Sequence, residues 1–564
     1  MSSINLENLT MPESTSYVCL FRNCYELESV KLPKNATIIH SLIFDGCYNL
    51  KNVDIPDTVT TIGFCAFQDC GIESITLPSS LTTIGEEAFG KCTNLESITI
   101  PDSVTIIDEG AFKGCTKLKN ITLSSSLTTI SKEAFCNCTE LESIIIPDSV
   151  ISIDEAAFKG CTKLKNIILP SLLTAIGSEA FSNCISLESI NIPDGVISIR
   201  GRAFENCTSL KSIKIPDSVE DIGFYAFKGC KNLKDITIPN SVTLIDLSVF
   251  ENCESLEHIK LPETVTEIRN SAFEGCRSLK NITLPDTVKA IGEHAFSECT
   301  SLEDIKIPES AKDIRCNAFS GCKKLTDITV PNGSLVICDS EFENCESLKQ
   351  VKLPDSVKKI TNCAFSGCRS LKNITLPNAL ISIGCYAFDE CTSLESIEIP
   401  YGTTDIGHYA FHQCESLKSI TLPNSLYYIG EHAFNNCESL GHIKLPDSID
   451  NIYNNTFAGC SSLEYITIPD AVKSIGSYAF SECKSLKNLE IPYGVTDIGF
   501  MAFYNCKNLK NITIPTSLNY INSYAFSECE SLETVTIISD CTSKIIDVRE
   551  LDLDTMDQWI FLYF

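Results

Sequence analysis

Residues 92–114 read CTNLESITIPDSVTIIDEGAFKG, and Cys115 begins the next copy of the same pattern. The element Phe-x-x-Cys occurs 23 times between Phe21 and Cys529, at intervals of 23 residues except for one step of 22 residues after Cys70. A fixed period of this length is typical of arrays in which each unit packs against its neighbours. We therefore predict one repetitive architecture through most of the 564-residue chain.

The first half of each unit has the pattern of a short strand. The segment L-x-x-I-x-I/L-P can be counted 24 times if residues 6–12 are taken as the first copy, and all 22 prolines then occupy its last position. Its alternation of β-branched residues predicts that Ile98 and Ile100 point inward while Thr99 points outward. Proline has no N–H to donate, so it suits the point where a strand leaves its ladder.

The second half of each unit, V-x-x-I-x-x-x-A-F-x-x-C, is expected to return along the other side. Its apolar residues would share the core with those of the strand. Glycine follows the returning isoleucine in ten copies, for example at Gly63, Gly85 and Gly177. Because glycine tolerates positive φ, we predict a turn there in which positive φ is useful but not required.

The repeat pattern L-x-x-I-x-I/L-P followed by I-G-x-x-A-F-x-x-C resembles the BspA-like class of leucine-rich repeats. Clear copies are residues 95–115, 371–391 and 417–437. The resemblance implies a leucine-rich repeat solenoid without catalytic residues. It also implies a cell-surface antigen or adhesin that binds matrix proteins or other cells, although a fold does not by itself fix a function.

The predicted fold is a horseshoe or arc with one continuous parallel sheet of about 24 short strands on its concave side. The convex side would hold turns, short strands or 3-10 segments. We place the repeat array at residues 1–538. Residues 539–564 break the pattern and end in WIFLYF, and we expect them to form a C-terminal cap over the last repeat.

Charge and hydropathy limit the possible partners. A net charge of −29 repels phosphate backbones, which disfavours nucleic-acid binding. No apolar run is long enough to span a membrane, and the five residues before Leu6 leave no room for a classical signal peptide. These features favour the cytoplasm, whereas the resemblance implies the cell surface. We expect a monomer whose ligand is a protein or a glycan.

The 23 cysteines of Phe-x-x-Cys, the repeat cysteines, occupy core positions among phenylalanine and leucine. We predict reduced, buried thiols there. Disulfides between neighbouring repeats are the alternative, since strand spacing of ~4.8 Å would allow them. Eight further cysteines are expected mostly on the returning segment, where they could be exposed: Cys19, Cys65, Cys136, Cys316, Cys338, Cys363, Cys385 and Cys541.

Candidates for catalysis, metals and cofactors are weak. His408 and His412 lie four residues apart in GHYAFHQC, a spacing that suits a metal only on a regular helix. The chain has no C-x2-C pair, no H-E-x-x-H, no G-x-x-x-x-G-K and no G-x-S-x-G. We predict no cofactor and no enzyme activity, and we interpret the two histidines as surface residues of a convex turn.

The outward residue between the two strand isoleucines defines a column, here called the strand column, that alternates threonine with charge. The candidate binding residues are Lys214, Thr237, Lys260, Thr283, Lys306, Thr329, Lys352 and Thr375. One interpretation is a solvated sheet face in which threonine separates the lysines. The other is a basic stripe that docks an acidic partner or a glycan.

Two further features accompany this column. Ile145 and Ile168 are adjacent apolar exceptions in it and form a candidate hydrophobic contact spot. The residue after the first leucine of each unit forms a flanking column, which alternates in sign in copies such as Glu96 and Lys119. Opposite charges on neighbouring strands attract, so we expect cross-strand pairs there.

These observations support three hypotheses for function. The first is a surface antigen or adhesin that binds proteins or glycans through the solenoid face. The second is an intracellular scaffold for protein interactions, and the third, kept for completeness, is an enzyme.

Overall fold

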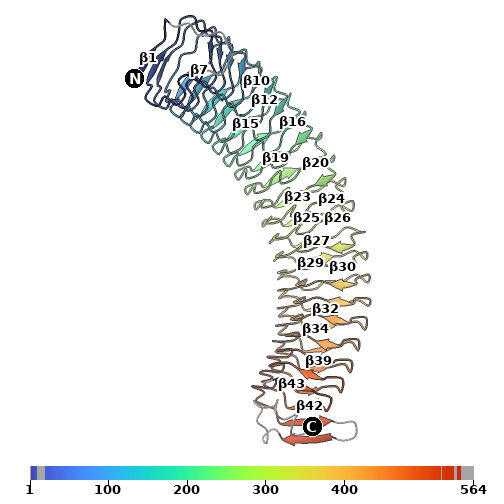
Figure 1. Cartoon of the computed structure of the whole chain (residues 1–564). Helices are drawn as coiled ribbons and strands as arrows, with labels where there is room; N and C mark the ends of the chain where they lie inside the picture. Colours follow the sequence, from blue (N-terminus) through green and yellow to red (C-terminus); the bar gives the residue numbers. More distant parts are fainter. Residues whose placement is uncertain (1, 9–18, 523, 539–542, 548–564) are drawn as a thin grey trace. The chain divides into compact units, whose positions relative to one another are not determined.

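The structure is a computed structural model that describes residues 2–8, 19–522, 524–538 and 543–547. The chain divides into two compact units, Met1–Thr287 and Val288–Phe564. Each unit is built from the same repeat, and the described residues contain strands and turns but no helix. Within each unit the strands form two parallel sets, here called the first and second ladders (Figure 1).

In its described residues, the Met1–Thr287 unit contains twelve strands of the first ladder and eleven of the second. The first-ladder strands are β1 (Ser3–Asn5), β2 (Ser29–Lys31), β4 (Asn52–Asp54), β7 (Ser97–Thr99), β9 (Asn120–Thr122), β11 (Ser143–Ile145), β13 (Asn166–Ile168), β15 (Ser189–Asn191), β17 (Ser212–Lys214), β19 (Asp235–Thr237), β21 (His258–Lys260) and β23 (Asn281–Thr283). The second-ladder strands are β3 (Ile38–Ile39), β5 (Thr61–Ile62), β6 (Thr83–Ile84), β8 (Ile106–Ile107), β10 (Thr129–Ile130), β12 (Ser152–Ile153), β14 (Ala175–Ile176), β16 (Ser198–Ile199), β18 (Asp221–Ile222), β20 (Leu244–Ile245) and β22 (Glu267–Ile268).

The Val288–Phe564 unit repeats this arrangement. Its first ladder contains β25 (Asp304–Lys306), β27 (Asp327–Thr329), β29 (Gln350–Lys352), β32 (Ser396–Glu398), β34 (Ser419–Thr421), β36 (His442–Lys444), β38 (Tyr465–Thr467), β40 (Asn488–Glu490), β42 (Asn511–Pro515) and β44 (Thr534–Ile538), followed by β45 (Ser543–Asp547). Its second ladder contains β24 (Ala290–Ile291), β26 (Asp313–Ile314), β28 (Val336–Ile337), β30 (Lys359–Ile360), β31 (Ser382–Ile383), β33 (Asp405–Ile406), β35 (Tyr428–Ile429), β37 (Asn451–Ile452), β39 (Ser474–Ile475), β41 (Asp497–Ile498) and β43 (Tyr520–Ile521).

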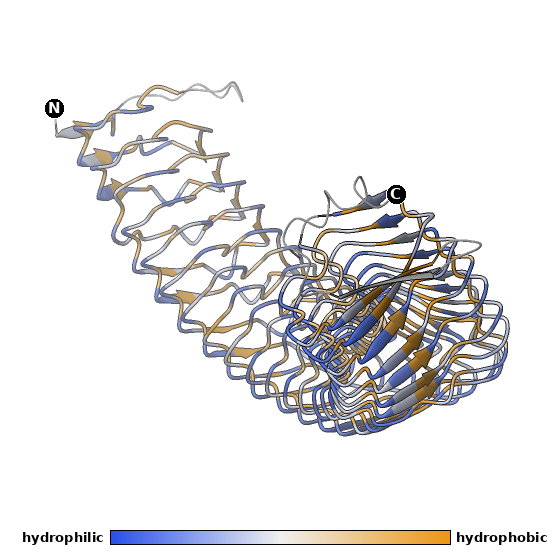
Figure 2. Ribbon diagram, turned by 90° about the horizontal axis from the view of Figure 1, so that it is seen from below, coloured by the Kyte–Doolittle hydropathy of each residue, from blue (hydrophilic) through white to orange (hydrophobic). Residues whose placement is uncertain are grey.

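The register confirms the predicted solenoid. Ile98 of β7 lies opposite Ile121 of β9, one repeat later, and the two strands run parallel. Ile98 is buried while its neighbours Ser97 and Thr99 are exposed, as the alternation predicts. Figure 2 shows apolar and polar residues following one another along the strands. The leucine-rich repeat architecture is therefore present in both units.

The predicted single continuous sheet is, in detail, a series of shorter ones. In the described chain, β7–β9 and β11–β13 are separate hydrogen-bonded pairs, although β9 and β11 are in contact. A strand of three residues offers few N–H and C=O groups to each neighbour, so small shifts break its ladder. Other contacts must therefore hold successive repeats together at these points.

The first repeat begins earlier than predicted. Ile4 of β1 pairs with Val30 of β2, so Leu6 corresponds to Leu32 and ends its strand motif rather than beginning it. The segment taken as the first strand motif, residues 6–12, mostly lies outside the described residues. The prediction was wrong because the first copy lacks the proline that marks the end of the strand in most later copies.

The phenylalanines form a stack that runs through the turns of each unit. Phe112 lies 5.4 Å from Phe89 and 5.7 Å from Phe135 between ring centroids, with nearly parallel rings. The Phe112 N–H donates to the Ala134 carbonyl of the next repeat at 2.9 Å. The turn therefore adds a third set of repeat-to-repeat hydrogen bonds, beside a continuous aromatic core.

Positive φ occurs at different positions from those predicted. From Phe44 onward, the residue two before the phenylalanine of each Phe-x-x-Cys element is left-handed, as is the residue before each repeat cysteine; Glu87 (φ 48°) and Lys91 (φ 55°) are examples. Their N–H groups donate to the next repeat, Glu87 to the Glu109 carbonyl at 2.8 Å and Lys91 to the Lys113 carbonyl at 2.6 Å. The left-handed backbone thus directs N–H groups along the stack.

The glycine after the returning isoleucine has a different role. Gly177 is outside the positive-φ region, and a Cβ added to it would lie 2.5 Å from the carbonyl carbon of Asp154 in the preceding repeat. The predicted positive φ was therefore wrong there. Glycine at this position allows the backbones of adjacent repeats to approach closely.

The repeat cysteines are free and, apart from the half-exposed Cys24, buried. The Sγ of Cys115 lies 3.1 Å from the Phe89 carbonyl, and the Sγ of Cys138 lies 3.2 Å from the Phe112 carbonyl. Each carbonyl already accepts the N–H of the cysteine in its own repeat, so the thiol donates to its second lone pair. This bond gives a reason for cysteine rather than alanine in the core.

The eight other cysteines are only partly where we expected them. Cys19 is exposed and Cys316, Cys338, Cys363 and Cys385 are half-exposed. Cys65 and Cys136 are buried, each 3% exposed, so the expectation of exposure was wrong for these two. Their returning segments are packed against the next repeat, which alternation alone does not reveal. Cys541 lies outside the described residues.

Thiol accessibility provides a direct measurement. Burial raises the pKa of Cys92 to about 12, so very little reactive thiolate exists there near neutral pH. We expect N-ethylmaleimide to modify Cys19, Cys316 and Cys385 of the native protein first, and all 31 thiols in denaturant without reductant. Mass spectrometry of the alkylated peptides gives the order. Fewer than 23 reactive thiols in denaturant would mean that the repeat cysteines form disulfides.

The last described strand differs in direction from the rest. β45 pairs antiparallel with β44 along five residues, from Thr534 opposite Asp547 to Ile538 opposite Ser543. A hairpin strand of this kind occupies the open edge of a parallel sheet. The other residues of the expected cap at 539–564 lie outside the described part, so the cap stays a prediction.

Candidate functional site

The structure places the strand column on the exposed face of the first ladder. The predicted residues are all exposed: Lys214, Thr237, Lys260 and Thr283 in the Met1–Thr287 unit, and Lys306, Thr329, Lys352 and Thr375 in the Val288–Phe564 unit. Seven of them end a strand, and Thr375 follows an isolated bridge between Asn373 and Ser396. Within each unit, two neighbouring lysines are therefore two strands apart, about 10 Å.

The four lysines predicted as binding residues have no ion-pair partner among the described residues, whereas Lys31 of the same column pairs with Glu7 and Asp54. Thr237 lies opposite Lys260, and Thr329 lies opposite Lys352, so each lysine faces a hydroxyl rather than a carboxylate. Acids occur at the other end of the same strands, as at Asp235 beside His258 and at Asp327. The face is therefore mixed in charge, with lysines whose ammonium groups are free to bind.

The flanking column behaves as predicted. Lys119 pairs with Glu96 at 3.3 Å, and Lys211 pairs with Glu188 at 2.7 Å. In the Val288–Phe564 unit, Lys418 pairs with Glu395 at 3.0 Å. Because these lysines are already neutralised by cross-strand partners, they compete for an external anion less well than the lysines of the strand column.

The apolar spot is exposed as expected. Ile145 of β11 and Ile168 of β13 are in register and are 69% and 63% exposed. Leu172 follows two residues after the strand motif and is 58% exposed. Serine occupies that position in about half of the copies, as at Ser103, whose hydroxyl donates to the Leu81 carbonyl at 2.6 Å. Leucine removes this bond and enlarges the apolar surface.

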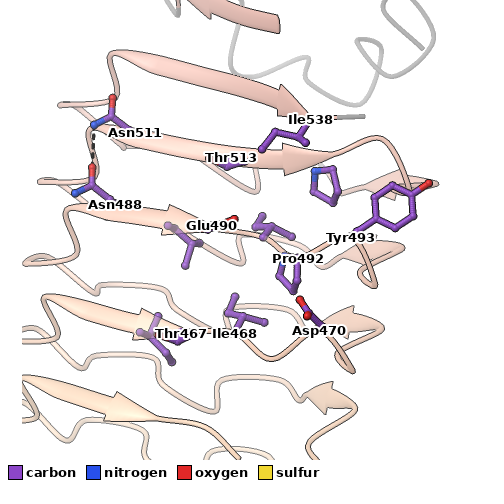
Figure 3. A pocket seen from close by; sticks show the side chains of 14 residues that line it. Thr467, Ile468, Asp470, Asn488, Glu490, Pro492, Tyr493, Asn511, Thr513 and Ile538 are labelled. Atoms are coloured by element: carbon purple, nitrogen blue, oxygen red, sulfur yellow. Dashed lines mark hydrogen bonds between the residues drawn. The ribbon is translucent and has the colours of Figure 1, made fainter. Parts of the chain in front are cut away.

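A groove of about 680 Å³ lies on the first-ladder face near the end of the Val288–Phe564 unit (Figure 3). Thr467, Glu490 and Thr513 of the strand column line its centre. Asn488 and Asn511 lie on one side, and Tyr493 and Ile538 on the other. The groove is therefore lined by carboxylate, amide, hydroxyl and aromatic groups.

None of the binding residues predicted from the sequence lines this groove. A signal was present in IPYG at residues 491–494, where tyrosine replaces aspartate, the residue that most often follows the strand proline. The same change occurs at Tyr401, in IPYG at residues 399–402. The pattern shows that both tyrosines depart from the repeat, but it does not show that only Tyr493 lines the groove described above.

His408 and His412 point to different partners. The Nδ1 of His412 lies 2.7 Å from the Asp389 carboxylate, whereas the Nδ1 of His408 accepts the Glu431 N–H at 3.1 Å. Tyr409 stacks between Tyr386 and His432, at 4.6 and 4.3 Å between ring centroids. Both histidines are half-buried parts of an aromatic cluster of the turns. In the described residues, no group of three or more His, Cys, Asp or Glu is arranged to hold a metal ion.

The described part of the chain also holds no helix of the length and apolarity that a membrane span requires.

Comparison with known proteins finds similarity over the same repeats. The family model described as "BspA type Leucine rich repeat region (6 copies)" matches residues 16–142, 128–256, 243–368, 335–464 and 450–547. A leucine-rich repeat protein from Bacteroides ovatus is 35% identical over 62% of this chain and 86% of its own, with a TM-score of 0.51. A leucine-rich cell surface protein from Faecalibacterium prausnitzii is 25% identical over 63% of this chain and 88% of its own, with a TM-score of 0.32. The comparison with curated proteins gave no match.

Proposed function

We propose a binding function for this chain, which belongs to the BspA-type leucine-rich repeat family. In this proposal it is a non-catalytic binding protein of the surface antigen or adhesin type. Its partner would be a protein with an acidic surface, bound through the exposed face of the first ladder. The observation that carries this proposal is the set of lysines in the strand column that lack an ion-pair partner among the described residues.

The spacing of these lysines supports an extended partner surface. Lys214 and Lys260 are separated by one intervening strand, and threonine of that strand lies between them. Two like charges about 10 Å apart repel weakly in salt, since the Debye length is about 8 Å at physiological ionic strength. An acidic protein surface would relieve that repulsion while threonine hydroxyls supply hydrogen bonds.

The overall negative charge limits which partners are suitable. With a net charge of −29, long-range forces oppose an acidic partner, so attraction must come from close contact at the lysines. The exposed isoleucines Ile145 and Ile168 would add apolar area on the same face. We therefore expect a specific, short-range interface rather than general attraction of anions.

Charge reversal tests this proposal. A partner is first captured on the immobilised full-length protein and identified by mass spectrometry. We expect the double change Lys214→Glu and Lys260→Glu to weaken its binding at least about tenfold in Kd, because each substitution replaces attraction by repulsion. The affinity is measured by surface plasmon resonance at two salt concentrations.

The matched control carries the same change of charge at Lys119 and Lys211, which already pair with Glu96 and Glu188. We expect this control to retain binding within a few-fold. Equal losses in both variants would show a general charge effect, and unchanged binding in the strand-column variant would remove the lysines from the interface.

Location is tested separately with antibody on intact and permeabilised cells. If the chain is an adhesin, we expect the antibody to stain intact cells. Staining only after permeabilisation would support the alternative of an intracellular interaction scaffold.

A further inference from the structure

We infer that the groove of the Val288–Phe564 unit is a binding site for a neutral oligosaccharide. It is formed by residues of β38, β40, β42 and β44 and by the turns that follow β38 and β40. This inference does not depend on the lysines of the strand column, which lie on other strands of the chain. Its failure would leave the proposed protein interface untouched.

The polar side of the groove holds two asparagine amides that are fixed by hydrogen bonds. Asn511 Nδ2 donates to Asn488 Oδ1 at 2.8 Å (Figure 3). Thr534 Oγ1 of β44 donates to Asn511 Oδ1 at 2.5 Å. These bonds hold both amides in place and leave Asn488 Nδ2 without a hydrogen-bond partner among the described residues. The row therefore offers an oriented donor to a ligand hydroxyl at little cost in ordering.

The centre of the groove supplies acceptors. Glu490 ends β40, is exposed, and has no ion-pair partner in the described chain. It lies opposite Thr513 of β42, whose hydroxyl both donates and accepts. A carboxylate beside hydroxyl and amide groups can bind the adjacent hydroxyls of a sugar ring through several hydrogen bonds at once.

The other side of the groove is apolar. Tyr493 is 54% exposed and Ile538 is 38% exposed, and Pro492 lies beside them (Figure 3). An aromatic ring that is left open to solvent offers a flat face to the C–H groups of a sugar ring, while its hydroxyl can still bind water or ligand. Polar groups on one side and an aromatic face on the other match the two kinds of surface that a saccharide presents.

The charge of the groove determines the class of saccharide. Asp470 and Glu490 both line it, and no lysine or arginine is among its lining residues. A sulfated or carboxylated sugar would bring a second negative charge beside these carboxylates and would be repelled. A basic peptide could pair with them, but the two asparagines and two threonines of the groove would gain less from it.

The experiment is calorimetric titration of the full-length protein with cellohexaose, maltohexaose, mannohexaose, a heparin-derived hexasaccharide and hexalysine. We expect at least one of the neutral hexasaccharides to bind, and the heparin hexasaccharide and hexalysine to bind more weakly. The substitution Tyr493→Ala should lower the affinity for the neutral sugar about tenfold or more, and Asn488→Ala severalfold.

The matched control is Tyr401→Ala, which removes the same side chain from the same position of an earlier repeat. Tyr401 is 82% exposed and does not line the groove. Unchanged sugar binding by this variant, together with unchanged thermal unfolding of Tyr493→Ala, supports the site. The inference is overturned if no neutral hexasaccharide binds, if hexalysine binds more tightly than the sugars, or if both tyrosine variants lose affinity equally.

Discussion

Replacement of Phe227 by alanine is expected to lower the free energy of unfolding by about 3–5 kcal/mol. Phe227 is fully buried and stacks between Phe204 at 5.5 Å and Phe250 at 5.7 Å. Removing its ring opens a cavity in the aromatic stack and removes contacts with both neighbouring repeats. Urea unfolding followed by circular dichroism measures the change.

The same repeat provides a control. Phe224 is 45% exposed and makes an edge contact with Tyr225, so Phe224→Ala removes a similar side chain without opening the core. We expect its cost to be below about 1 kcal/mol. Because repeats interact mainly with neighbours, the Phe227 variant should also show a broader or split transition. Equal stability of the two variants would mean that the stack is not a major source of cohesion.

Replacement of Glu341 by alanine is expected to stabilise the protein. Glu341 is 1% exposed and occupies the core position that alanine fills in the flanking repeats, at Ala318 and Ala364. One carboxylate oxygen accepts the Cys338 N–H at 2.8 Å, while Oε1 has no hydrogen-bond partner in the described chain. A buried acid in this position has the cost of desolvation without full compensation.

The increase in stability caused by Glu341→Ala should depend on pH. Burial raises the pKa of Glu341 from 4.5 to about 8. Below pH 4.5 the carboxyl is protonated in both the folded and unfolded states, so its ionisation does not lower the free energy of unfolding. As the pH rises from 4.5 towards 8, the unfolded chain releases its proton and the folded chain retains it, so wild-type stability falls. Above pH 8 the full cost of ionising the buried carboxyl is present, on the order of 5 kcal/mol.

Urea unfolding at pH 5 and pH 9 tests this dependence. Relative to the wild type, Glu341→Ala should gain much more free energy of unfolding at pH 9 than at pH 5. Glu341→Gln should remove this pH dependence of stability, but its side chain should still fit poorly in the core. The control Glu343→Ala changes an acid two residues away that is partly exposed, and we expect it to alter stability by less than about 0.5 kcal/mol. A loss of stability in Glu341→Ala at pH 9 would show that the carboxylate has a stabilising partner.

Several features of the chain were accessible from pattern alone. The recurrence of Phe-x-x-Cys and the alternation around residues such as Ile98 predicted parallel strands, a shared core and reduced thiols, and the structure confirms that the repeat cysteines are buried, apart from the half-exposed Cys24. These features depend on which side of the chain a residue faces, and a period records this directly. The cross-strand pairs of the flanking column, as between Lys119 and Glu96, follow from the same register.

The errors share a cause. The glycines such as Gly177 were assigned to positive φ, and Cys65 was expected at the surface, because a single repeat does not show how closely the next one approaches. The left-handed residues are instead those whose N–H groups bond to the next repeat, as at Glu87. Both outcomes depend on distances between backbones of adjacent copies.

The sequence by itself determined the repeat, the inward and outward residues and the absence of known catalytic motifs, because period and alternation specify the face on which each side chain lies. Only the tertiary structure decided which lysines are unpaired, that Glu341 has an unsatisfied oxygen, and that Tyr493, Asn488 and Glu490 line one groove. These properties arise between residues of different repeats, where small differences in packing and hydrogen bonding determine the environment of side chains that occupy equivalent positions in the sequence.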